Sequence, residues 1–199
     1  MVRALLEDLV ERGLDLRRCY LVVIDGGKAL RAGVERIFGA QAEVQRCQIH
    51  KVRNVVEHLP EGCRADWKRR LRNAYAMISY EEAEAALEKL WRQLVEINPS
   101  AARSLEEGME ETLTLHRLGV APLRRRSLSS TNLIESCLST VRRVTRNVKR
   151  WRGGTHIARW TAAGLLEAER KFRRVKGYRE LPELARKLNL GLHSQEQVA

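Results

Sequence analysis

The stretch from Tyr20 to Arg46, YLVVIDGGKALRAGVERIFGAQAEVQR, indicates the fold class. Its first five residues form an unbroken, largely β-branched apolar run, which is typical of a strand buried on both faces. Residues 29–38 repeat apolar side chains at helical spacing, and residues 42–46 are short and alternate, which predicts a helix and a second strand. With a further helix at residues 2–12, the order helix, strand, helix, strand predicts an α/β fold with a short parallel sheet, dominated by helices.

One acidic side chain, Asp25, stands directly at the carboxyl end of the first predicted strand. In parallel α/β sheets, side chains at this end of the strands face the crevice in which active sites form. An ordinary role is equally open, because an aspartate before two glycines suits a turn or a helix cap. The Gly26–Gly27 pair has neither the G-x-G-x-x-G nor the Walker pattern, so we expect no nucleotide cofactor.

A second informative stretch runs from Ser127 to Gly154 and contains one acid, Glu135, among many arginines. Its apolar residues recur at spacings of three and four, which predicts a helix from about Thr131 that extends towards the Gly153–Gly154 pair. The polar face of this helix carries Glu135 in line with three cations. We expect the other face to form one buried stripe, made of Ile134, Cys137, Leu138, Val141, Val144, Val148 and Trp151.

Glu135 has no basic residue three or four positions away along this helix, so its partner must come from elsewhere. One interpretation is that the carboxylate holds a divalent cation beside a DNA phosphate. Another is a capping box, in which Asn132 and Glu135 satisfy the first backbone amides of the helix. The local pattern leaves both interpretations open.

The formal net charge of +12 is concentrated in one part of the chain. Residues 1–122 hold 19 basic and 19 acidic side chains, whereas residues 123–179 hold 16 basic and 3 acidic ones. A surface that follows a phosphate backbone requires such a concentration of cations. The alternatives are a merely solvated helix face or a membrane surface. The chain has no lipidation motif and no apolar run of ~18 residues, so we expect no membrane association.

The cysteines indicate a reduced, cytoplasmic protein, because they show no C-x-x-C spacing and no signal peptide is recognisable. Cys47 and His50 open a predicted helix directly after the second strand. As a zinc site this pair is incomplete, since His58 and Cys63 are too irregularly spaced to supply a second pair. We favour hydrogen bonding and packing at the edge of the crevice, with His50 near phosphate.

Residues 64–119 show helical periodicity throughout and have balanced charge, which indicates an all-helical insertion. One role open to Trp67 and Trp91 is stacking on an exposed base, but we favour packing in the core for both. The expected core positions are Trp67, Leu71, Tyr75, Ile78, Ala83, Leu87, Leu90, Trp91, Leu94, Ile97, Ala102, Leu105, Met109 and Leu113. After Gly154, a further basic helix begins at Thr155, and Pro182 starts a short final helix.

These residues resemble the Mutator-like group of bacterial insertion-sequence transposases. The similar blocks follow the family's order along nearly the whole chain: LVVIDGGKAL, VQRCQIHKVRNV, SSTNLIES with VRRVTRNVKRWRGG, and LLEAERKFRRVKGYRELPEL. The resemblance combines a strand-end aspartate, a C-x-x-H, a helical insertion and a glutamate helix.

The resemblance implies an RNase H-like catalytic domain with a DDE triad. Asp25 matches the second acid of that triad and Glu135 the third, while Cys47 and His50 match the family's C-x-x-H marker. Such carboxylates hold Mg²⁺ or Mn²⁺ for in-line attack on a DNA phosphate. The basic residues that would hold the DNA backbone are Arg142, Arg143, Arg146, Lys149, Arg150 and Arg152.

The sequence also departs from the family pattern. The fold that it resembles begins with three antiparallel strands, the first of which carries the first aspartate, and we expect this chain to begin at the following helix. Neither Asp8 nor Asp15 ends a buried apolar run, so neither replaces the missing acid. The sheet would then have one unpaired side.

We therefore expect a partial RNase H-like core over residues 1–50, an all-helical insertion over 51–125, and the glutamate helix with basic C-terminal helices over 126–199. The expected function is DNA transposition by a homo-oligomer acting on insertion-sequence ends and target DNA. We expect this chain to be a truncated and inactive copy. The alternative is a non-catalytic basic protein that binds DNA or RNA, or that inhibits an intact transposase.

Overall fold

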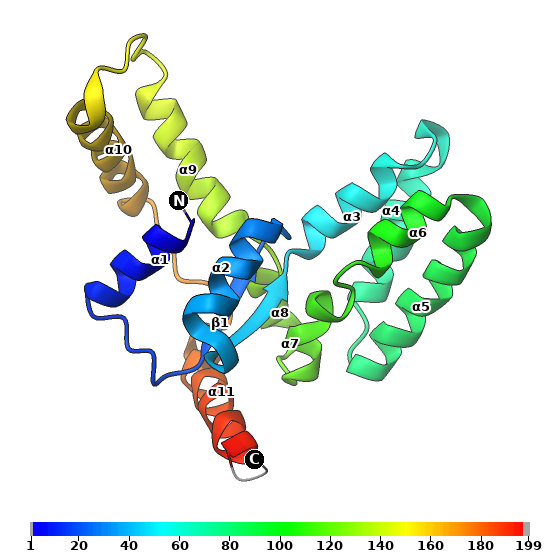
Figure 1. The fold of residues 1–199 in the computed structure, drawn as a ribbon. Coiled ribbons are helices and arrows are strands. Elements are labelled where there is room, and N and C mark those ends of the chain that lie inside the picture. The colour runs from blue at the N-terminus through cyan, green and yellow to red at the C-terminus, as the bar shows by residue number, and fades with distance from the viewer. Residues whose placement is uncertain (1, 197–199) are drawn as a thin grey trace.

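The computed structural model describes residues 2–196, with side chains as far as Asn189. Two parallel strands, β1 (Tyr20–Ile24) and β2 (Ala42–Arg46), pair in the register Val22 to Val44 at the centre of the molecule (Figure 1). The helix α2 (Lys28–Phe38) and the short 3₁₀ helix η1 (Gly39–Gln41) connect them. The helix-dominated α/β fold, its parallel pairing and the bounds of both strands are as the sequence predicted.

One face of the sheet is covered by α1 (Val2–Glu11) and α2. The core between them consists of Ile24, Val34, Phe38 and Val44. Gly33 allows the two helices to approach closely, since a Cβ atom there would lie 2.9 Å from Val2 Cγ1. This small cluster is the hydrophobic base on which the end of β1 is held.

The outer edge of β2 is closed by side chains from a segment far along the sequence. This segment comprises η2 (Glu110–Leu113) and α7 (Thr114–Arg117). The Thr114 hydroxyl donates to the Val44 carbonyl at 2.6 Å, and Gln45 Oε1 accepts the Leu115 amide at 3.0 Å. Gln45 Nε2 donates to the Thr112 carbonyl at 2.9 Å. The Thr114 bond satisfies one backbone carbonyl of β2, and the Gln45 side chain joins the strand to the backbone of the η2–α7 segment.

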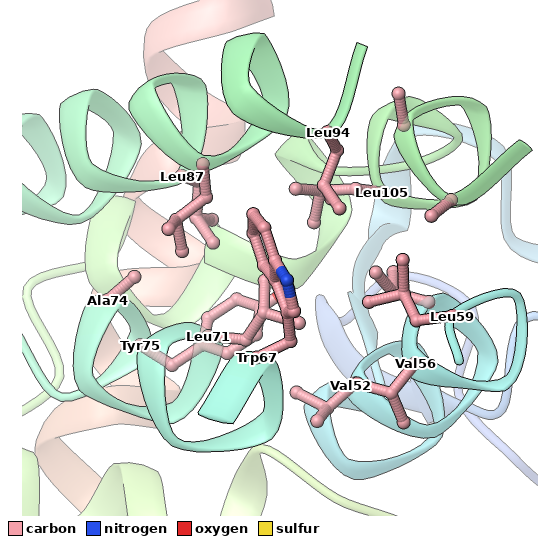
Figure 2. Packing of buried hydrophobic residues seen from close by; sticks show 14 of the residues in the cluster. Val52, Val56, Leu59, Trp67, Leu71, Ala74, Tyr75, Leu87, Leu94 and Leu105 are labelled. Carbon is pink, nitrogen blue, oxygen red and sulfur yellow. The ribbon is translucent and has the colours of Figure 1, made fainter. Parts of the chain in front are cut away.

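The region after β2 is helical, as predicted: α3 (Gln48–Glu57), α4 (Glu61–Tyr75), α5 (Tyr80–Ile97) and α6 (Pro99–Glu106). Figure 2 shows the Trp67 side chain in the middle of their shared core, among leucines and valines. Trp67 is 4% exposed, so it packs rather than presenting a stacking surface, and Trp91 is partly buried against the same core. Ile78 and Ile97 were expected inside but are exposed, because Ile78 lies in the connection between α4 and α5 and Ile97 is the last residue of α5.

Two buried cations attach this helical region to the sheet. Lys51 Nζ donates to the carbonyls of Ser104, at 2.6 Å, and of Glu107. Arg46 Nη1 donates to the same Glu107 carbonyl at 2.9 Å. These carbonyls lie at the C-terminal end of α6, where the helix dipole favours positive charge. Gly26 has φ +97°, and a side chain there would occupy the position of the Arg46 guanidinium.

The segment after α8 (Pro122–Leu128) forms a helical hairpin that extends away from the sheet (Figure 1). Its helices are α9 (Asn132–Thr145) and α10 (Gly153–Glu169), and they pack closely, since a Cβ atom at Gly164 would lie 2.9 Å from Val141 Cα. The predicted helix is too long, because α9 ends at Thr145 and residues 148–152 are not helical.

The predicted buried stripe of α9 is also wrong for most of its members. Cys137 is buried, but Ile134 is 55% exposed, Trp151 is 44% exposed, and Leu138 is exposed as well. The reason is that α9 is covered on one side by α10 alone and projects from the rest of the molecule.

The final helix α11 (Leu181–Glu196) follows the 3₁₀ helix η3 (Tyr178–Glu180) and is longer than the short helix predicted. It returns to the sheet, where Leu184 and Leu188 pack with Leu115 and Val120. Asn189 Oδ1 accepts the Cys19 amide at 2.9 Å, directly before β1.

Lys51 gives a testable dependence of stability on pH. Burial, reinforced by the charge of Arg46, lowers the pKa of Lys51 from its ordinary 10.5 to about 8. Between these values the unfolded chain binds a proton that the folded chain has released, so the free energy of unfolding rises with pH, by up to about 3 kcal/mol. Urea unfolding at pH 8 and 10.5 should show this rise in the wild type relative to Lys51→Met. An equal pH dependence in both proteins would contradict it.

Candidate functional site

Asp25 lies at the carboxyl end of β1 with its side chain exposed. Its Oδ1 accepts the backbone N–H of Gly27 at 2.9 Å, which is the turn-forming role that the sequence left open. The second carboxylate oxygen makes no hydrogen bond to the side chains that the structure describes. Asp25 is thus held in one orientation while part of its carboxylate remains accessible.

Cys47 lies between β2 and α3 in the chain and contacts the end of β1. Its backbone N–H donates to the Ile24 carbonyl at 2.7 Å, so Cys47 lies beside Asp25 at the same end of the sheet. Its thiol is fully buried and lies 3.2 Å from His50 Nδ1. The sequence predicted this packing role at the edge of the crevice for both residues.

The start of α9 docks on this Cys47–His50 pair. Thr131, the residue before α9, places its backbone N and its Oγ1 3.5 Å from Cys47 Sγ. The same hydroxyl lies 3.2 Å from His50 Nδ1. Nearby, the backbone N–H of Gln48 donates to the Ser129 carbonyl at 2.9 Å. Segments that are distant in the sequence are therefore fixed together at the carboxyl end of the sheet.

Glu135 is held by this same cluster. The Thr131 hydroxyl donates to Glu135 Oε1 at 2.5 Å, and His50 Nε2 lies 3.6 Å from that oxygen. His50 is thus a partner of Glu135 from outside α9, where no position along the helix supplies a basic residue. Asn132 is the first residue of α9 rather than its cap, so the structure does not form the capping box considered from sequence. The Glu135 side chain is half exposed, which leaves its other oxygen open to a ligand.

The structure brings Asp25 and Glu135 to the same end of the sheet through Cys47 and His50, without joining the two carboxylates directly. Within the part of the chain that the structure describes, no group of three or more His, Cys, Asp or Glu side chains is placed to hold one metal ion. The carboxylates of Asp25 and Glu135 offer oxygen ligands, the type that Mg²⁺ and Mn²⁺ prefer. Together these residues supply two carboxylates.

The predicted DNA-contacting cations all lie on the outward surface of the α9–α10 hairpin. Two are on the exposed face of α9 and four are in the connection to α10: Arg142, Arg143, Arg146, Lys149, Arg150 and Arg152. None of the six forms an ion pair with the described side chains, whereas some cations elsewhere on the surface, such as Arg92 with Glu88, do. Unpaired cations in a row are available to phosphate groups.

Sequence reasoning missed Thr131, which contacts Cys47, His50 and Glu135 at once. The available signal was its position, a hydroxyl residue four positions before the lone acid, where a side-chain hydrogen bond along the helix start is possible.

Comparison with known proteins assigns the chain to a family. A family model described as "Transposase, Mutator family" matches residues 2–175. The chain belongs to the Mutator family of transposases. This match covers α1 to α10, and therefore both carboxylates, the Cys47–His50 pair and all six cations.

Among curated proteins, this Mutator-family chain is 28% identical over 181 residues to the transposase for insertion sequence element ISRM5 of Rhizobium meliloti, covering 91% of the chain and 45% of that protein. It is 29% identical to the transposase for element IST2 of Acidithiobacillus ferrooxidans, covering 73% and 48%. For the transposase of element IS256 in transposon Tn4001 of Staphylococcus aureus, the identity is 27%, covering 81% and 40%. The chain therefore spans less than half the length of these relatives.

Within residues 2–196 of this Mutator-family chain, no helix is both long enough and apolar enough to cross a bilayer.

The Thr131 hydroxyl provides a test of the cluster. Thr131→Val removes the donor to Glu135 and leaves buried polar neighbours unpaired, so we expect a loss of about 1 to 3 kcal/mol in the free energy of unfolding. Thr155→Val, at an exposed position, is the matched control and should change stability by less than about 0.5 kcal/mol. Equal effects in urea unfolding would show that Thr131 does not hold the cluster together.

Proposed function

We propose that this chain forms the part of a DNA transposase that supplies two metal-binding carboxylates and a surface for the DNA backbone. One observation carries the proposal: Thr131 and His50 fix one oxygen of Glu135 and leave the rest of its carboxylate open, at the end of the sheet where Asp25 lies. A carboxylate that is exposed, held in one orientation and not paired with an arginine is suited to act as a ligand of a metal cation.

Mg²⁺ or Mn²⁺ is the cation that such oxygen donors favour, and it would supply activation of a water or DNA 3′-hydroxyl and stabilisation of the leaving oxygen. Within the chain, the Gly27 amide orients Asp25, and the Thr131 hydroxyl orients Glu135. His50 Nδ1 lies 3.2 Å from the Thr131 hydroxyl and His50 Nε2 lies 3.6 Å from Glu135 Oε1, so the ring borders both side chains. In this proposal the fold is RNase H-like, and the two acids are members of a DDE triad.

The six unpaired cations of the α9–α10 hairpin would hold the DNA backbone beside these acids. Their lack of acidic partners among the described side chains supports this role, as does membership of a transposase family. Contacts of this kind position DNA without reading its sequence. Cytoplasmic location and assembly into a homo-oligomer belong to the same proposal.

Two carboxylates bind a divalent cation more weakly than three and do not organise a pair of metal ions. We therefore propose that the chain by itself binds DNA and metal but does not complete strand transfer. A second candidate follows from the same observation: a non-catalytic DNA-binding protein that joins, and thereby inhibits, an intact transposase.

Metal titration tests the role of Glu135. Mn²⁺ binding, measured by electron paramagnetic resonance of the free ion, should be weak in the wild type and at least tenfold weaker in Glu135→Gln and in Asp25→Asn. Glu88→Gln, an exposed acid on α5, is the control and should bind as the wild type does. Unchanged binding in both site variants would contradict the proposed metal site. Strand transfer by the wild-type chain in Mg²⁺, lost in Glu135→Gln, would overturn the proposal of inactivity.

Salt dependence of DNA binding tests the cation surface. Replacing Arg142, Arg146 and Lys149 by alanine should lower the slope of log K against log salt concentration by about 1 for each lost phosphate contact. Replacing Arg69, Lys89 and Arg92, exposed cations of the helical region, should leave the slope unchanged. Fluorescence anisotropy with a labelled duplex measures both. Equal slopes in all three proteins would remove the hairpin from the DNA interface.

A further inference from the structure

A pocket of about 600 Å³ lies between α3, α4 and α8, outside the carboxylate site. Its volume falls within the range of pockets that bind small organic groups. Side chains from all three helices line it, together with Ser129 from the segment that leads to α9. The backbones of Gln48 and Ser129 bond to each other beside the carboxylate site, and the other lining residues have no part in that site.

The pocket presents apolar side chains that are unusually open to solvent. Ile49, on α3, is 47% exposed, and Leu123, on α8, is 54% exposed. Val52, Val56 and Tyr75 form the buried part of the lining. Such a lining suits a flat, apolar ligand surface.

The same pocket is lined by five cations and no acid: Arg53, Lys68, Arg72, Arg125 and Arg126. Only Arg53 has an acidic neighbour, Glu57 at 3.8 Å, among the described side chains. The ligand should therefore carry negative charge as well as an apolar surface.

Arg125 is the most informative of these cations, because it is only 5% exposed. Its Nη2 donates to the Met77 carbonyl at 2.8 Å, but its Nη1 is buried without a partner. Burial also lowers the pKa of Arg125. A buried guanidinium N–H without an acceptor is costly, and an anionic ligand in the pocket would relieve that cost.

The pocket adjoins the carboxylate site through the first turn of α3. Gln48 and Ile49 line the pocket, while Cys47 and His50, on either side of them in sequence, contact Thr131. Ser129 lines the pocket two residues before Thr131. The pocket is therefore next to the two segments that hold Glu135 in place.

We infer that this pocket binds an unpaired nucleotide of the DNA strand, with its base against Ile49 and Leu123 and its phosphate against Arg125 and the surrounding cations. The inference rests on the proposed function and adds to it a site for a nucleotide outside the double helix. A base has an apolar face that packs on such side chains, and it is attached to an anion, which matches both properties of the pocket. An acidic peptide matches the charge but would have no reason to lie beside the carboxylate site.

Binding of two duplexes of equal length tests the inference, one fully paired and one carrying a single unpaired 2-aminopurine. The wild-type chain should bind the bulged duplex about tenfold or more tightly, since base packing contributes about 1 to 3 kcal/mol. Ile49→Gln and Leu123→Gln should abolish most of this preference and leave affinity for the paired duplex within twofold. Both residues are exposed, so these variants should fold; Ile97→Gln, an exposed isoleucine outside the pocket, is the control.

Equal affinity of the wild type for the two duplexes would overturn the pocket assignment while leaving the proposed DNA-binding function intact. A preference that persists in Ile49→Gln and Leu123→Gln would overturn it as well. Failure to bind either duplex would overturn the proposed function and the pocket together. Binding of a fluorescent glutamate- and leucine-rich peptide that is lost in Leu123→Gln, with no discrimination between duplexes, would assign the pocket to an acidic peptide instead.

Discussion

The contacts of Cys47 are the constraint on which the arrangement of this protein depends. Its backbone N–H extends the pairing of β1 and β2, and its thiol lies between His50 and Thr131. Because this residue is completely buried, the three segments that meet there are fixed by close packing as well as by hydrogen bonds. Asp25 and Glu135 are far apart in the sequence and lie at the same end of the sheet for this reason.

The two-stranded sheet is too small to organise the molecule by hydrophobic burial alone. Buried polar side chains on and after β2 add hydrogen bonds that attach other segments to the sheet. Gln45 bonds the η2–α7 segment, and Arg46 and Lys51 bond the end of α6. Networks of this kind are specific in direction, so they fix how the helical region sits on the sheet. Arg46 Nε remains buried without a partner, which is a cost of this arrangement.

In the α9–α10 hairpin, apolar side chains at helical spacing are partly buried against the neighbouring helix and partly exposed. Its apolar periodicity is that of a buried helix, but α10 alone covers α9, so Ile134 and Leu138 remain exposed beside a row of cations. A projecting hairpin of this composition offers both charge and apolar surface to a partner. The pocket beside α8 has the same combination on a smaller scale, with an inward-facing guanidinium in place of surface cations.

The sequence by itself determined both strands, the parallel pairing, the helical region with its core, and the outward basic face, because each depends on local periodicity or composition. It also singled out Asp25, Glu135, Cys47 and His50, and it showed that Glu135 had no basic partner within its own helix. Only the tertiary structure decided that Glu135 lies against His50, that Thr131 links the cluster, and that Cys137 alone in the predicted apolar stripe is fully buried. These outcomes depend on which distant segments come into contact, and neither helical period nor charge count specifies such contacts.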